Sequence, residues 1–152
     1  MRVSAKVDYG LRAMTELAAS PAGTWVKGEA IATAQSMSVN FCENILRELR
    51  RAGFVEAHRG ADGGYRLARP AAEIYLAQII RVLEGPLAAV QGLRPEQLEF
   101  TGSAEPLQHV WIAVRSHLRA VLDVVTLADV AGNDLPDDVR QLVADPENWT
   151  PR

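Results

Sequence analysis

Residues 38–52 carry polar side chains whose types and spacing suit the reading of DNA bases. On a helix, Asn40, Glu43, Asn44 and Arg47 lie on one face, because positions three and four apart are neighbours. In a major groove, asparagine pairs with adenine, arginine pairs with guanine, and glutamate accepts a hydrogen bond from cytosine. The same residues also suit an ordinary solvent-exposed face, so the prediction depends on the elements around them.

The preceding residues predict the rest of a helix-turn-helix. A helix is expected over residues 28–35, a turn at Ser36 and Met37, and an N-cap at Ser38 for the next helix. An earlier helix is expected from its cap at Ser4 to about Ala19. The face of 38–52 opposite the polar residues is apolar at helical spacing, which predicts a buried stripe. Its members are Cys42, Ile45, Leu46 and Leu49.

A glycine-rich hairpin follows the helix that begins after Ser38. Residues 54–58 and 65–67 alternate like two paired strands, and residues 59–64 between them include three glycines. Arg59 at the tip could enter a minor groove, where narrow A·T tracts attract arginine. Arg66 and Arg69 could hold phosphates. Helix-turn-helix followed by such a wing predicts a protein that binds duplex DNA.

Residues 106–125 predict the longest helix, with an apolar seam that the small N-terminal domain is too small to bury. We expect this seam to be a dimer interface, and the alternative is an ordinary core helix. The expected interface residues are Leu107, Val110, Trp111, Val114, Leu118, Val121, Leu122 and Val125.

The predicted fold is therefore mainly α with a small β-wing. It divides into a winged helix-turn-helix DNA-binding domain (1–85), a loop that is a candidate effector region (86–105), a dimerisation helix with a short following helix (106–131), and an acidic C-terminal tail (132–152). The sequence leaves open whether the tail is mobile or docks through Leu142, Val143 and Trp149.

Composition limits the function classes. Residues 1–70 hold ten Lys/Arg and seven Asp/Glu, whereas residues 71–152 hold six and twelve, so a basic front half precedes an acidic back half. No apolar run is long enough to span a membrane and no signal peptide is evident, so a cytoplasmic location is expected. The sequence has no phosphate-binding loop, HExxH motif or nucleophile elbow, so we expect no enzymatic activity.

Read together, these motifs resemble the Rrf2 family of bacterial winged-helix regulators, which includes iron–sulfur, nitric-oxide and cysteine-metabolism regulators. The match extends over about residues 1–131. It lies in residues 4–13 (SAKVDYGLRA), 31–32, 38–49, 52–55, 59–60, 63–70 (GGYRLARP), 84–87 (EGPL) and 126–129 (TLAD).

The resemblance implies a homodimer that binds a palindromic operator in double-stranded DNA and usually represses transcription. Carried over residue by residue, it places some side chains in the major groove, namely Ser38, Asn40, Phe41, Glu43 and Asn44. It places Arg59 and Gly60 in the minor groove. It places Ser4, Lys6 and Tyr9 on the DNA backbone.

The sequence departs from the family pattern where an iron–sulfur cluster would bind. Relatives that hold a cluster usually carry three cysteines in the loop after the EGPL motif, and residues 88–106 contain none. Some relatives use a carboxylate and a histidine of the first helix, but Arg12 stands where that histidine would be, four residues after Asp8. His109 and His117 are too far apart to share one metal within a chain. We therefore expect no iron–sulfur cluster and no other metal cofactor.

Three hypotheses remain at this point. The first is a cluster-free transcriptional regulator that responds to an unknown small molecule, metal or partner at residues 86–106 and the long helix. The second is a degenerate winged helix used for protein interaction. The third is a sensor whose cluster or metal has ligands other than loop cysteines. The lone cysteine, Cys42, is expected to be a buried core residue, with a redox switch as the alternative.

Overall fold

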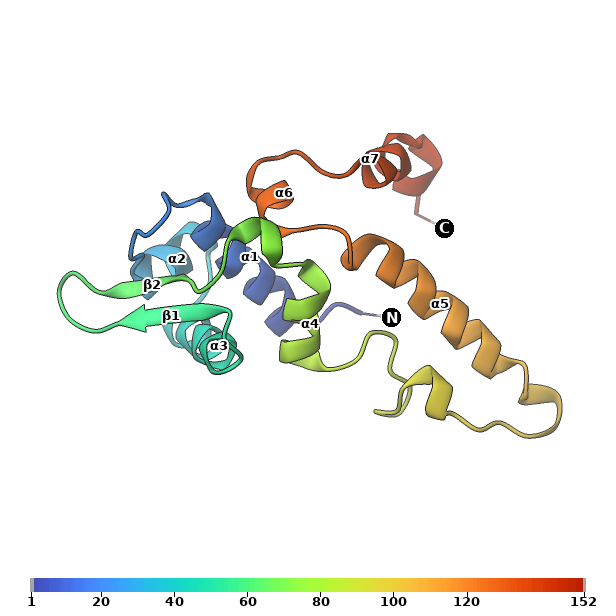
Figure 1. The fold of residues 1–152 in the computed structure, drawn as a ribbon. Coiled ribbons are helices and arrows are strands. Elements are labelled where there is room, and N and C mark those ends of the chain that lie inside the picture. Colours follow the sequence, from blue (N-terminus) through green and yellow to red (C-terminus); the bar gives the residue numbers. More distant parts are fainter. Residues whose placement is uncertain (1, 152) are drawn as a thin grey trace.

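The structure, a computed structural model, describes residues 2–151 and has two regions (Figure 1). The first is a helical domain with a projecting hairpin. Its elements are α1 (Ala5–Ala19), α2 (Gly28–Ala34), α3 (Val39–Arg51), β1 (Val55–His58), β2 (Gly64–Leu67), α4 (Leu76–Glu84) and α6 (Leu127–Ala131). The second region extends away from it, with α5 (Leu107–Leu122), the loop before it, and α7 (Asp137–Ala144). The predicted mainly α fold with a small β-wing is confirmed.

The caps that the sequence predicted form as expected. The Ser4 hydroxyl accepts a hydrogen bond from the Val7 N–H at 3.2 Å, and the Ser38 hydroxyl accepts one from the Phe41 N–H at 3.3 Å. The turn between α2 and α3 places Ser36 at a φ of 52°, a left-handed conformation that is uncommon for a residue with a side chain.

The core lies where α1, α3 and α4 meet. All four members of the predicted stripe of α3 are buried, and they pack with Met14 and Leu17 of α1 and with Ile79 and Leu83 of α4. Gly10 allows α1 to approach α4, because a Cβ there would lie 2.3 Å from Leu83 Cδ1. The burial of this stripe sets the rotation of α3 about its own axis.

The wing is an antiparallel pair in which Val55 opposes Leu67 and His58 opposes Gly64. A single bridge between Val26 and Tyr65 adds an extended piece before α2, with N–H to oxygen distances of 2.8 and 2.7 Å. Gly64 permits this approach, because a Cβ there would lie 2.4 Å from the Val26 carbonyl oxygen. The hairpin is therefore attached to the domain at its base.

The structure shortens two of the predicted helices. The segment expected as helical from Ile74 begins as a helix only at Leu76. The long helix ends at Leu122, not at residue 125. Both differences have one cause: Leu76 N–H donates to the Val125 carbonyl at 3.0 Å, and Leu127 N–H donates to the Ile74 carbonyl at 2.9 Å. These bonds return the chain to the core, where Leu127 is fully buried.

The C-terminal tail forms helix α7 and a short 3-10 turn at Pro146–Trp149. Leu142, Val143 and Trp149 are all exposed, so they do not dock on the rest of the described chain. The Trp149 ring N–H donates to the Val143 carbonyl at 2.7 Å, which folds the tail on itself. Between residues 2 and 151, no helix combines the length and apolarity needed to cross a lipid bilayer.

Candidate nucleic-acid interface

The outer face of α3 presents the polar residues that the sequence singled out. Ser38, Asn40, Asn44 and Arg47 are exposed. The Arg47 guanidinium donates to the Asn44 side-chain oxygen at 2.8 Å, so these two residues form one oriented pair. Groups of this kind can offer donors and acceptors to base edges in a major groove.

Glu43 differs from the other residues of this face. It is half-buried, and it lies close to Gly28 and the Tyr65 ring, both of which would be within 3.3 Å of a Cβ added at Gly28 or its neighbouring atoms. Burial raises the pKa of Tyr65, and the Glu43 charge raises it further. Glu43 is therefore drawn toward α2 and the wing, and less of it faces outward than the sequence suggested.

Phe41 and Tyr9 join the start of α3 to α1. Their rings meet edge to face at 5.7 Å between centroids and an interplanar angle of 89°. The guanidinium of Arg12 lies 5.0 Å from the Tyr9 ring centroid and pairs with Asp8 at 2.7 Å. The sequence analysis considered Arg12 only as a departure from a metal ligand, and this stacking places it among the exposed cations beside α3.

Ser4 and Lys6, which were expected on the DNA backbone, hold α1 to the rest of the domain. The Lys6 ammonium pairs with Glu48 at 2.8 Å and donates to the Leu83 carbonyl at 3.0 Å, and the Ser4 hydroxyl donates to Glu84 at 2.9 Å. An ammonium has three donors, so Lys6 keeps one for a further partner. These contacts could not be found from sequence spacing, because the partners are 42 to 80 residues away.

The wing divides its cations into a free one and an engaged one. Arg59 and Gly60 at the tip are exposed, and within residues 2–151 the Arg59 side chain has no ion pair or hydrogen bond. Arg66 pairs with Glu56 at 2.8 Å and lies 4.2 Å from the Trp25 ring centroid. Arg59 is therefore the cation with freedom to reach a partner.

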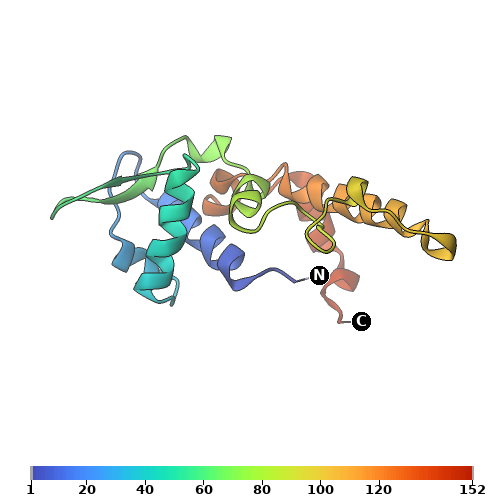
Figure 2. The same cartoon turned by 90° about the horizontal axis from the view of Figure 1, so that it is seen from below.

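Lys27 is a wing residue that sequence reasoning missed. Its ammonium donates to the Gly60 carbonyl at 2.9 Å, which links the residue before α2 to the tip of the hairpin. Both views show the hairpin projecting from the helices beside α3 (Figures 1 and 2). Lys27 was not found because its place at the tip depends on the pairing of Val26 with Tyr65.

The expected dimer residues lie on or after α5, a helix with no buried residue. Leu107 and Val110 are exposed, and Val110 exposes 49% of its surface. Val125 differs from the others, since it lies beyond the end of α5 and is buried within its own chain. The remaining five are half-buried, namely Trp111, Val114, Leu118, Val121 and Leu122.

The residues of this chain do not fit a thiolate-bound iron–sulfur cluster. Cys42, the only cysteine, is fully buried in the core stripe of α3, and Asp8 is paired with Arg12. His109 and His117 are exposed on α5. Among residues 2–151, no three His, Cys, Asp or Glu side chains are grouped so that they could hold a metal ion.

A three-helix core, a helix that presents a polar face and an adjacent wing define a winged helix-turn-helix DNA-binding protein. The chain belongs to the Rrf2 family, described as iron-dependent transcriptional regulators, whose model matches residues 3–133. The predicted family and the absence of enzymatic activity are confirmed, because this is a family of transcriptional regulators.

Similar proteins come from bacteria. Rv1287, a predicted HTH-type transcriptional regulator of Mycobacterium tuberculosis, is 46% identical over 145 residues, which are 95% of this chain and 90% of that protein. The HTH-type transcriptional regulator CymR of Bacillus subtilis is 38% identical over 132 residues, which are 86% of this chain and 90% of that protein.

Solved structures agree in fold. CymR, described as the global cysteine regulator of B. subtilis, has a TM-score of 0.74 at 36% identity, with 88% of this chain and 98% of that chain covered. IscR of T. potens has a TM-score of 0.72 at 34% identity, with 99% and 97% covered.

The environment of Cys42 gives the first testable prediction. Burial, followed by the Glu43 charge, raises the pKa of the Cys42 thiol from 9.0 to about 11. Because only the thiolate reacts, this difference alone should slow modification by an aromatic disulfide reagent at pH 8 by about 100-fold relative to the unfolded chain. The measurement compares the reaction rate in buffer with the rate in concentrated urea. A native rate within about tenfold of the unfolded rate would contradict the core assignment and favour a redox switch.

Proposed function

We propose that this protein acts in the cytoplasm as a homodimeric repressor that binds a roughly two-fold symmetric operator without an iron–sulfur cluster. The observation that carries the proposal is the exposed pair Asn44–Arg47 on α3, next to a wing whose Arg59 is free. A helix with such a pair suits the major groove, and a free arginine at a hairpin tip suits an adjacent minor groove.

The dimer part of the proposal is supported by α5. A helix of sixteen residues that contains leucine, valine and tryptophan but buries none of them leaves an apolar surface in water. Such surfaces on a regulator are usually covered by a partner. A second copy of the chain, related by a two-fold axis, would bury α5 against itself and place two α3 helices about 34 Å apart along DNA.

The cluster-free part is supported by donor chemistry. A cluster needs thiolates or, less often, imidazoles. The loop that follows α4 supplies neither over residues 88–106, and the Cys42 thiol lies in the core. We therefore propose that signal recognition uses other groups of this loop and of α5.

DNA binding should depend on salt and on two arginines. With DNA from upstream of the protein's own gene, affinity should fall steeply between 50 and 200 mM salt, by about 10³-fold if six or more phosphates are contacted. Arg47→Ala should weaken binding about tenfold or more and relax selectivity, since it removes a base contact. Arg59→Ala should weaken binding mainly on A·T-rich flanks. Titrations by fluorescence anisotropy measure all three effects.

Arg140→Ala is the matched control, because Arg140 lies on α7 and pairs with Asp134 and Asp137. It should bind DNA as the unaltered protein does. An equal loss on every sequence for Arg59→Ala would reduce Arg59 to a phosphate contact. Binding that is weak, insensitive to salt and unselective would contradict the repressor and favour a protein-interaction module.

The oligomeric state should depend on the exposed seam of α5. Val110→Glu places a charge where an apolar contact with the second copy is expected, so the sedimenting species should change from twice the 16.6 kDa chain mass to the mass of one chain at micromolar concentration. Ser116→Glu is the control, since Ser116 is exposed on the opposite face of α5. Circular dichroism checks that both variants keep their helices. A wild-type monomer, or a dimer unaffected by Val110→Glu, would refute this interface.

A further inference from the structure

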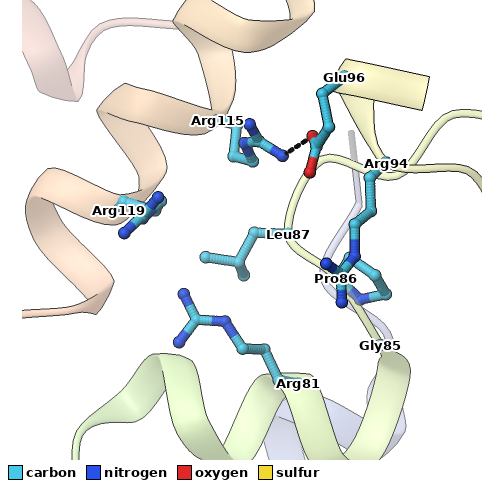
Figure 3. A pocket seen from close by; sticks show the side chains of 8 residues that line it. All are labelled: Arg81, Gly85, Pro86, Leu87, Arg94, Glu96, Arg115 and Arg119. Carbon is cyan, nitrogen blue, oxygen red and sulfur yellow. Dashed lines mark hydrogen bonds and ion pairs between the residues drawn. The ribbon is translucent and has the colours of Figure 1, made fainter. Parts of the chain in front are cut away.

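A cavity of about 410 Å³ lies between the end of α4, the loop after it and α5 (Figure 3). Four arginines line it: Arg81 from α4, Arg94 from the loop, and Arg115 and Arg119 from α5. Leu87 lies among them, and Glu96 lines the same hollow. We call this site the arginine pocket.

The arginine pocket carries more positive than negative charge. Arg115 pairs with Glu96. Arg81 and Arg119 share Asp123, at 2.7 and 2.9 Å. Arg94 forms no ion pair with any residue between 2 and 151. Four guanidinium groups therefore face two carboxylates, which leaves two positive charges uncompensated.

Both carboxylates are ionised at neutral pH, so this charge balance holds. In Glu96, a hydrogen bond from the backbone N–H of the residue itself and then one from Arg115 lower the pKa. In Asp123, partial burial acts to raise the pKa, but hydrogen bonds from Arg119 and Arg81 outweigh it and hold the pKa below its usual value.

The arginines also converge in space. They come from three separate segments of the chain, and Figure 3 shows Arg81 and Arg94 reaching toward Leu87 from one side while Arg115 and Arg119 stand across from them. Each guanidinium engaged with one carboxylate keeps further N–H donors. Planar N–H pairs of this kind match the oxygens of a carboxylate or phosphate.

We propose that the arginine pocket binds a small ligand with two negative charges on oxyanion groups, either a phosphomonoester or a dicarboxylate. The ligand neutralises the uncompensated charge and accepts from donors that Glu96 and Asp123 leave free. The cavity volume lies near the lower end of the range for small-molecule sites, so the ligand is a small metabolite and not a nucleic acid or a dinucleotide.

The pocket is connected to the residues that position α3. Arg81 belongs to α4, whose Leu83 carbonyl and Glu84 carboxylate accept hydrogen bonds from Lys6 and Ser4 of α1. A ligand that draws Arg81 toward Arg119 changes the angle between α4 and α5, and with it the separation of the two α3 helices in a dimer. It shifts DNA affinity only if it binds the two arrangements unequally. This regulatory consequence rests on the proposed function, whereas the binding site itself does not.

Isothermal titration of the full chain, without DNA, tests the binding site. The probes are inorganic phosphate and succinate, with acetate as a monoanion at matched ionic strength. At least one dianion should bind with a Kd of about 1 mM or below and at least tenfold more tightly than acetate. Phosphate alone would identify a phosphomonoester site, and succinate alone a dicarboxylate site.

Two variants assign the binding to the pocket. Arg94→Gln should weaken the tighter dianion at least tenfold, and it removes no ion pair that the fold uses. Arg140→Gln, outside the pocket, should bind the dianion as the unaltered protein does. The proposal is overturned if neither dianion exceeds acetate or if Arg94→Gln binds as tightly as Arg140→Gln. Because this titration contains no DNA, its failure is distinguishable from a failure of operator binding.

Discussion

The burial of the apolar stripe of α3 is the interaction on which the rest of the structure depends. Ile45, Leu46 and Leu49 are almost completely buried against α1 and α4. Each contributes about 1.5–3 kcal/mol on burial, so together they exceed what a single base contact of about 1–3 kcal/mol could offset. The helix therefore cannot rotate to suit a ligand. Its outward face, with Asn40, Asn44 and Arg47, is fixed before any partner arrives.

Helix α4 links this fixed reading helix to the part of the chain that varies within the family. On one side it receives the hydrogen bond from Lys6, which also pairs with Glu48 of α3. On the other side the chain after α5 returns through the bonds that join Ile74 to Leu127 and Leu76 to Val125. Movement of α5 relative to α4 is therefore transmitted to the domain through a few directed contacts. The loop between α4 and α5, which lacks cysteine, contributes arginines to this junction instead.

Local signals made much of the fold predictable, and contacts between distant residues explain what was missed. Ser4, Ser38 and Thr126 mark helix starts by chemistry that acts within three residues, and the alternation around the glycines of the wing is equally local. The early end of α5, the inward position of Glu43 and the internal bonds of Lys6 depend on partners dozens of residues away. The arginine pocket is a similar case, because Arg81, Arg94 and Arg119 show no pattern until the chain folds. The tail helix α7 was missed because its acidic, proline-flanked sequence resembles a linker.

The central claim is that two copies of α3, held by α5, read two half-sites of one DNA turn. Selection of bound duplexes from a random pool by the full-length protein tests it most directly, because it assumes no operator. The account predicts that the enriched sequences contain an inverted repeat whose half-sites are centred about 10 base pairs, or a multiple of one turn, apart. Enrichment of a single asymmetric site, or no enrichment above the input pool, would contradict it.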